Sequence, residues 1–164
     1  MKAGSILVVL GTVALAAPAA GQVTSQVTSQ APSQTTSDND VVQLGGSSWR
    51  LHGIDMPDAQ QVCADGWRAG EESRAALQRL TDGAKLECRN TGKDQYSRPV
   101  ATCLVNGEDL GETLVRQGMA WASLRYTWRY MLDDWIAWFD GAGLYAHKCE
   151  KPWEWRARTG DGRK

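Results

Sequence analysis

Two stretches of the chain place carboxylates and arginines at spacings that suit phosphodiester chemistry. The first contains Asp40, Arg50, Asp55 and Asp58, and the second ends at Arg98. Carboxylate oxygens are ligands that Ca²⁺ prefers, so Asp40 and Asp55 are candidate metal ligands. Asp58 would then stand within reach of a metal-bound water. The two arginines suit a phosphodiester because the guanidinium fork matches phosphate geometry and stays charged.

Spacing alone leaves a second interpretation open, because acidic residues at strand ends and turns are often solvated or act as caps. Which interpretation holds depends on the strands and turns that position these acidic residues. Residues 41–44 and 49–54 flank the turn sequence Gly-Gly-Ser-Ser, which predicts a β-hairpin. A hairpin followed by a turn at Pro57 would bring Asp40 and Asp55 together.

Four cysteines allow three disulfide connectivities, and the strand pattern favours one of them. Residues 84–89 and 100–105 read as strands joined by a turn-rich segment. If these strands pair about a centre between residues 95 and 96, Cys88 lies opposite Cys103 at a distance that a disulfide can close. Cys63 and Cys149 are left for each other. A metal site is the alternative use of four cysteines, but the chain has no Cys-x-x-Cys pair.

Three helical segments follow from periodicity and capping signals. Helical spacing covers 66–81, with Ala76, Leu77 and Leu80 directed inward. Asp109 and Glu112 form a capping-box pattern that opens a short helix closed by Gly118. An apolar stripe predicts a third helix that faces the core, made of Trp128, Met131, Leu132, Trp135, Ile136 and Phe139. Strands first, with helices between and after them, predict a small α+β barrel.

Composition sets the limits of the folded domain. The 164 residues are 42% apolar and 23% charged with a net charge of −1, which is typical of one globular domain and excludes a strongly basic surface. Residues 1–21 have the pattern of a signal peptide, whose apolar run is too short to span a bilayer. We expect residues 22–37 to form a flexible Gln/Thr/Ser tether, residues 38–158 the folded domain, and residues 159–164 a disordered basic tail.

These segments predict a secreted or periplasmic protein that has no membrane segment once the signal is cleaved. We expect a monomer. Basic residues near the C-terminus would either contact a polyanion or be solvated, and they are Lys148, Lys151, Arg156, Arg158, Arg163 and Lys164.

Four segments in register, 38–44, 50–58, 94–98 and 114–120, resemble the staphylococcal-nuclease-like, or thermonuclease, family. The order and separations match from about residue 38 to residue 143, and the sequence at 152–156 resembles the ending of secreted bacterial members. The resemblance implies a five-stranded OB-type β-barrel with three helices. It also implies a Ca²⁺-dependent nuclease that hydrolyses phosphodiester bonds of DNA and RNA.

The resemblance assigns a role to each matched position. Asp40 and Asp55 match the metal carboxylates, and Met56 sits where the family uses a backbone carbonyl. Asp58 matches the residue that orients or deprotonates the attacking water. The remaining matches contact substrate: Arg50 and Arg98 at the scissile phosphate, and Tyr96 and Tyr126 beside the nucleotide.

Several positions depart from the family pattern. Asn39 and Val41 replace a Gly and a Thr, Asp58 is one methylene shorter than the usual Glu, Ser97 replaces a turn Gly, and Leu124 replaces a tyrosine. The strand that normally precedes the first motif is here the tether. A weakened nuclease, a binding module for single-stranded nucleic acid or another anion that no longer cleaves, and an exported accessory protein therefore all remain hypotheses.

Overall fold

Two sheets carry the segments that the sequence singled out. The computed structural model describes residues 39–160. Its larger sheet has the order β1-β2-β5-β4, with β6 on β5, and consists of β1 (Val41–Leu44), β2 (Ser47–Leu51), β4 (Leu86–Lys93), β5 (Pro99–Val105) and β6 (Glu108–Asp109). A second, two-stranded sheet pairs β3 (Ile54–Asp55) with β7 (Trp121–Ala122).

Strand register brings the two arginine-bearing stretches together. β1 and β2 form the predicted hairpin, in which Val41 pairs with Arg50. β2 then pairs in parallel with β5, so that Arg50 lies opposite Val100. Because side chains two residues apart in an extended chain share a face, Arg98 follows the face of Val100 beside Arg50.

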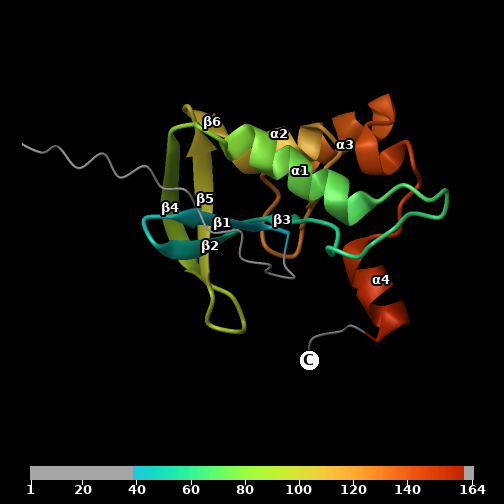
Figure 1. The fold of residues 1–164 in the computed structure, drawn as a ribbon, viewed down its shortest axis with the longest axis horizontal. Helices are drawn as coiled ribbons and strands as arrows, with labels where there is room; N and C mark the ends of the chain where they lie inside the picture. Colours follow the sequence, from blue (N-terminus) through green and yellow to red (C-terminus); the bar gives the residue numbers. More distant parts are fainter. Residues whose placement is uncertain (1–38, 161–164) are drawn as a thin grey trace, which may run out of the picture. The chain divides into compact units, whose positions relative to one another are not determined.

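Four α-helices and one 3₁₀ helix complete the described residues. They are α1 (Ala69–Thr81), α2 (Leu110–Arg116), α3 (Met131–Asp140), η1 (Gly143–Tyr145) and α4 (Pro152–Thr159). The predicted capping box is present, since the Asp109 side chain accepts a hydrogen bond from the Glu112 amide at 3.1 Å. Figure 1 shows α1, α2 and α3 together on one side of the strands and α4 apart from them.

The predicted α+β class and five-stranded sheet are confirmed, whereas the count of three helices is wrong. The additional helix, α4, begins with Pro152 at its first turn, a favourable position for proline, and buries Trp155. Within residues 39–160 the strands also form no closed barrel, because β3 and β7 pair in a sheet of their own. The break falls at Gly53, whose φ of 77° leads β2 into β3.

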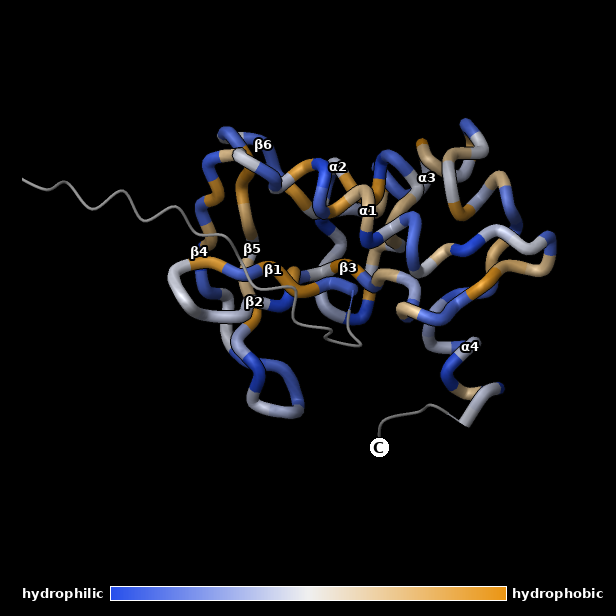
Figure 2. The backbone as a smooth tube through the Cα atoms, viewed as in Figure 1, coloured by the Kyte–Doolittle hydropathy of each residue, from blue (hydrophilic) through white to orange (hydrophobic). Residues whose placement is uncertain are grey.

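The main core lies between the larger sheet and the helices. Ala76 and Leu77 of α1 are buried as predicted, and Leu80 packs against them in part. They contact apolar residues from the strands and from α2, among them Val42, Leu51, Ile54, Ala101, Leu110, Leu114 and Val115. In Figure 2 these strands carry hydrophobic segments, and the loop between β4 and β5 is hydrophilic.

The apolar stripe of α3 does not face the core, which overturns that prediction. Trp135 is 68% exposed and Phe139 is 84% exposed. Tyr130, Asp133 and Ala137 are buried instead. The reason is that polar partners on other elements hold the acidic side of this helix inward, as described below.

Both predicted disulfides are confirmed. Cys88 pairs with Cys103 across the β4–β5 ladder, with a Cα–Cα distance of 4.0 Å. Cys63 pairs with Cys149 and links the loop before α1 to the segment before α4. No helix among residues 39–160 is apolar and long enough to cross a bilayer. The predicted signal peptide and tether, and residues 161–164 of the tail, lie outside the described residues.

Candidate active site

The residues predicted for the site line one cleft of about 1010 Å³. They reach it from the β1–β2 hairpin, from β3 and the loop after it, from the β4–β5 loop and from the segment after β7. All eight are present in its wall: Asp40, Arg50, Asp55, Met56, Asp58, Tyr96, Arg98 and Tyr126. Folding therefore collects in one place the positions that the family resemblance singled out.

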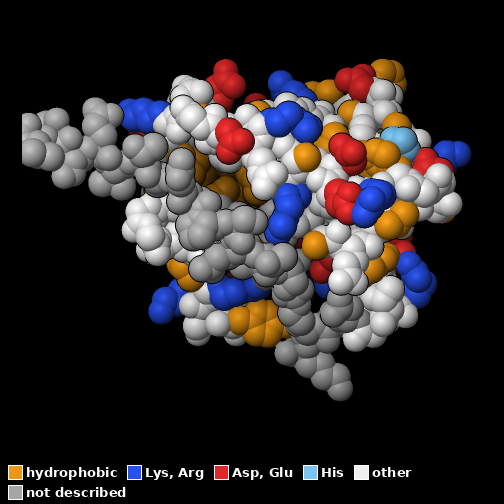
Figure 3. Space-filling model, in the orientation of Figure 1, with side chains coloured by type: hydrophobic (Ala, Val, Ile, Leu, Met, Phe, Trp, Pro, Cys, Tyr) orange, Lys and Arg blue, Asp and Glu red, His pale blue; other side chains and the backbone are white. Residues whose placement is uncertain are grey.

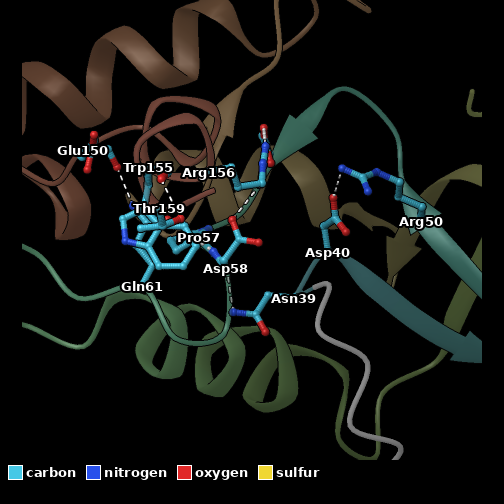
Figure 4. Close-up of polar contacts among 11 residues, drawn as sticks. Asn39, Asp40, Arg50, Pro57, Asp58, Gln61, Glu150, Trp155, Arg156 and Thr159 are labelled. Carbon is cyan, nitrogen blue, oxygen red and sulfur yellow. Dashed lines mark hydrogen bonds and ion pairs between the residues drawn. The ribbon is translucent and has the colours of Figure 1, made fainter. Parts of the chain in front are cut away.

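Asp40 and Arg50 form an ion pair at one side of the cleft. The Asp40 carbonyl accepts a hydrogen bond from the Leu51 amide at 2.8 Å, which extends the hairpin ladder beyond β1. Its buried carboxylate lies 2.7 Å from Arg50 Nη2. Figure 4 shows Asp40 and Arg50 turned toward one another. This pair places one carboxylate and one phosphate-binding candidate in direct contact.

Asp55 and Asp58 share a cation that the sequence did not predict for the site. Arg156 Nη2 donates to Asp55 Oδ2 at 2.9 Å, and Arg156 Nη1 donates to Asp58 Oδ2 at 2.8 Å. Partial burial would lower the pKa of this guanidinium, but the charges and hydrogen bonds of the two carboxylates outweigh burial and raise the pKa. Arg156 is therefore a fixed positive charge inside the candidate site.

α4 can deliver Arg156 because its beginning is anchored to the loop that carries Asp58. The Cys63–Cys149 disulfide joins the two segments, and Gln61 Nε2 donates to the Glu150 carbonyl at 2.6 Å. The sequence placed Arg156 among the basic residues near the C-terminus and in the 152–156 segment that resembles the ending of secreted members, without a role in the site. Its link to the cleft could have been sought from the Cys63–Cys149 pairing, which ties that segment to the Asp58 loop.

Asn39, which replaces a family Gly, joins three parts of the site. Its buried side-chain amide donates to the Pro57 carbonyl at 2.8 Å and to the Gly70 carbonyl at 2.7 Å. Arg74 Nε donates to Asn39 Oδ1 at 3.2 Å. α1 also touches the Asp58 backbone, because a Cβ on Gly70 would lie 2.1 Å from the Asp58 carbonyl oxygen. These contacts fix Asp40 and Asp58 relative to each other.

Asp94 holds the loop that presents Tyr96 and Arg98. Its carboxylate accepts from the amides of Tyr96 and Arg98, both at 2.9 Å, and from Arg98 Nε at 2.6 Å. Burial raises the pKa of Asp94, but hydrogen bonds from Arg98 and Tyr96 outweigh it, so the pKa is lowered overall. Ser97, at the family's turn glycine, has a φ of 63°, a conformation that favours glycine.

Aromatic side chains are exposed along the cleft wall. Tyr96 and Tyr126 are among them, and the Arg98 guanidinium lies 5.4 Å from the Tyr96 ring centroid. Trp153, which the sequence did not predict for the site, also lines the cleft, with Lys151 Nζ 5.2 Å from its ring centroid. Exposed rings beside cations suit stacking against nucleobases.

The donor atoms of this cleft fit a hard cation in type. Asp40 and Asp55 offer carboxylate oxygens, and Met56 follows Asp55 with a backbone carbonyl. No cluster of three or more Asp, Glu, His or Cys side chains that could hold a metal occurs within residues 39–160. An ion here would therefore depend on two carboxylates supplemented by carbonyl and water oxygens, and it would compete with Arg156 for Asp55.

The OB-like α+β fold and a cleft in which Asp40, Asp55 and Asp58 lie with Arg50, Arg98 and Arg156 are the features to compare with known proteins. Residues 48–135 match the family described as staphylococcal nuclease homologue, and the chain belongs to this family. The matched range includes Asp55, Asp58 and Arg98 but neither Asp40 nor Arg156.

Several proteins from plants and bacteria are similar to this chain. The staphylococcal-like nuclease CAN1 of Arabidopsis thaliana is 32% identical over 69% of this chain and 34% of its own length. The succinoglycan biosynthesis protein ExoI of Rhizobium meliloti (strain 1021) is 33% identical over 51% of this chain and 47% of its own. An uncharacterized endonuclease of Haemophilus influenzae is 30% identical over 65% and 58%. This chain thus spans between about a third and somewhat over half of these relatives.

Proposed function

We propose that this protein is a Ca²⁺-dependent nuclease that hydrolyses phosphodiester bonds of DNA and RNA. The observation that carries the proposal is the convergence of Asp40, Asp55 and Asp58 with Arg50 and Arg98 in one cleft. Family membership and relatives named as nucleases support it. We also propose that the chain is exported, which its two disulfides support.

The roles follow from the chemistry of each side chain. Arg50 and Arg98 bind the scissile phosphate and stabilise the charge that develops on its equatorial oxygens. Asp58 orients the attacking water and accepts its proton. Asp40, Asp55 and the Met56 carbonyl would hold Ca²⁺, which when bound would supply Lewis-acid stabilisation of the phosphate. Exposed Tyr96 and Tyr126 offer stacking surfaces for the flanking bases.

Arg156 determines whether Asp58 can act as a base. Arg156 Nη1 donates a hydrogen bond to Asp58 Oδ2, so this oxygen becomes available to the proton of a water molecule only when Arg156 moves away. In the described arrangement Arg156 contacts Asp55 as well. We propose that metal and substrate binding displaces Arg156 from at least one of these carboxylates.

A second candidate function rests on the same contact. If Arg156 remains on Asp55 and Asp58, it takes the place of the metal charge, and the cleft becomes a binding site for nucleic acid or another anion without turnover. Arg50, Arg98 and the exposed aromatic rings would still bind a single strand.

Cleavage assays on labelled single-stranded DNA and RNA distinguish the two functions. We expect cleavage with Ca²⁺, loss of cleavage with chelator, and reduced turnover in Arg98→Lys, because an ammonium cannot reproduce the guanidinium fork. Arg158→Lys is the control, since Arg158 pairs with Glu150 outside the cleft lining. Strand binding without cleavage at saturating Ca²⁺, in both the wild type and Asp58→Glu, would establish the binding module instead.

A further inference from the structure

α3 packs with its acidic side inward and its apolar side toward solvent. Its outward side chains, together with Trp128 from the turn before it, are each between 42% and 84% exposed: Trp128, Leu132, Trp135, Ile136, Trp138 and Phe139. We call this set the α3 aromatic face. Apolar side chains also reach the surface at the upper right of Figure 3, the region in which Figure 1 draws α3.

The inward side of α3 is held by specific polar contacts. Asp133 accepts from Arg116 of α2 at 2.6 Å, and Asp134 accepts from the Ala122 amide of β7 at 2.9 Å. Ala137, on the same helix, is fully buried. Because these partners fix the rotation of the helix, the aromatic face is left outside the core.

An exposed apolar face of this size needs a partner. Large aromatic side chains bury roughly 150–250 Å² each when covered, and five of the six side chains are at least 65% exposed, so the face offers roughly 700 Å². That exceeds the usual largest apolar patch of a monomer, about 300–600 Å², and approaches the roughly 800 Å² per partner of a standard interface.

We propose that the α3 aromatic face is the interface of a homodimer, in which two copies of α3 pack antiparallel about a two-fold axis. An apolar face that repeats itself across such an axis is self-complementary. The proposal does not depend on the proposed nuclease activity, and it replaces the monomer expected from the sequence.

Charge at the two ends of α3 supports the antiparallel arrangement. Exposed Arg125 precedes the helix, as does Arg129, which pairs with Asp109 at 2.9 Å, and exposed Asp140 ends the helix. Neither Arg125 nor Asp140 has an ion-pair partner within residues 39–160 that the structure records. Antiparallel packing would bring each Asp140 near the partner's basic end and the positive end of its helix dipole.

A lipid surface fits the same face less well. Interfacial helices usually carry several Lys or Arg residues beside the apolar face, which attract anionic lipids. Here the helix contains no Lys or Arg: seven of its ten residues are apolar, and the other three are Asp.

 Its charged residues are Asp133, Asp134 and Asp140. The first two are held inward, so the exposed charge on α3 is that of Asp140, which an anionic membrane would repel.

Sedimentation velocity of the purified full chain tests the proposal. We expect a concentration-dependent dimer in the wild type, and a rise in the dimer dissociation constant of roughly a hundredfold or more in Trp135→Glu and in Phe139→Glu. Both side chains are exposed in the single chain, so the variants should keep the wild-type circular dichroism spectrum. The matched control is Val62→Glu, which changes an exposed apolar residue outside the face and should leave the dimer intact.

Three results would overturn the proposal. One is a monomer at every concentration whose tryptophans are readily quenched by acrylamide. Another is a monomer that co-sediments with vesicles of anionic phospholipid and loses this binding in Trp135→Glu, which would assign the face to a lipid surface. The third is a dimer whose dissociation constant is the same in the wild type, Trp135→Glu and Phe139→Glu. Weakening by Asp140→Arg would support the antiparallel arrangement in particular.

Discussion

Arg156 contacts Asp55 and Asp58 at once, with hydrogen bonds of 2.9 and 2.8 Å. The C-terminal helix α4 thereby places a guanidinium between one carboxylate proposed to bind metal and one proposed to activate water. A metal ion bound at Asp55 and the positively charged Arg156 guanidinium would repel each other at such short range. The position of Arg156 therefore affects both proposed roles, metal binding at Asp55 and activation of water at Asp58.

Removing the Arg156 charge should strengthen metal binding. We expect Arg156→Gln to bind Ca²⁺ about tenfold more tightly than the wild type, because the competing positive charge is gone. Isothermal titration calorimetry, or luminescence of Tb³⁺ as a Ca²⁺ substitute, measures this without reference to activity. Arg158→Gln on the same helix is the control and should bind as the wild type does, since Arg158 pairs with Glu150. Weaker binding in Arg156→Gln would instead make Arg156 a positioning residue for the carboxylates.

Asn39 should contribute to stability although it replaces a family glycine. Asn39→Ala removes two buried hydrogen bonds, to the carbonyls of Pro57 and Gly70, and we expect a loss of about 2 kcal/mol in the free energy of unfolding. Denaturant unfolding measures it. Gln43→Ala, which removes an exposed side-chain contact with Ser48, should change the free energy by much less. Equal effects of the two substitutions would show that the Asn39 contacts are not needed.

The two disulfides should differ in how much they stabilise the fold and in which segment they hold in place. The Cys63–Cys149 bond closes a loop of 86 residues, and the chain-entropy relation gives about 4.5 kcal/mol, against about 3 kcal/mol for the 15-residue Cys88–Cys103 loop. The double replacement Cys63→Ser/Cys149→Ser should also release α4 and increase amide exchange there. If α4 exchanges as slowly as in the wild type, the disulfide is not what holds Arg156 in the cleft.

Buried Tyr130 and half-buried Tyr145 predict a loss of stability at alkaline pH. Burial, with the charges of Asp109 and Asp134, raises the pKa values of Tyr130 and Tyr145 well above the ordinary value of 10.0. Above pH 10 the unfolded chain loses these protons while the folded chain keeps them, so stability falls as the pH rises. Tyr130→Phe should make this fall shallower in thermal melts, and the exposed Tyr126→Phe is the control. An unchanged slope in Tyr130→Phe would contradict the assignment.

Local and periodic features of the fold could be predicted from the sequence. The β1–β2 hairpin, the opposition of Cys88 and Cys103 and the cap at Asp109 depend on residues close together along the chain. The set of residues in the cleft could be predicted only through the family resemblance, because on spacing alone acidic residues at strand ends and turns are more often solvated or capping.

Apart from the Cys63–Cys149 disulfide, the side-chain contacts between distant segments described here could not be predicted. Arg156 lies 101 residues from Asp55, and no local pattern distinguishes it from the other basic residues near the C-terminus. The prediction of which side of α3 faces the core was wrong for a related reason. Its apolar stripe indicated the core, but Arg116 and the Ala122 amide, on other elements, bind its aspartates and select the opposite side.

The most direct measurement of the proposed function is the rate of single-stranded DNA cleavage by the wild type and by Asp40→Asn, each with saturating Ca²⁺ and with chelator. We expect cleavage only by the wild type with Ca²⁺, since a neutral amide loses most of its attraction to a hard dication. Folding of Asp40→Asn is checked by its circular dichroism spectrum. Cleavage that is equal in all four conditions, or no cleavage by the wild type with Ca²⁺, would contradict a calcium-dependent nuclease.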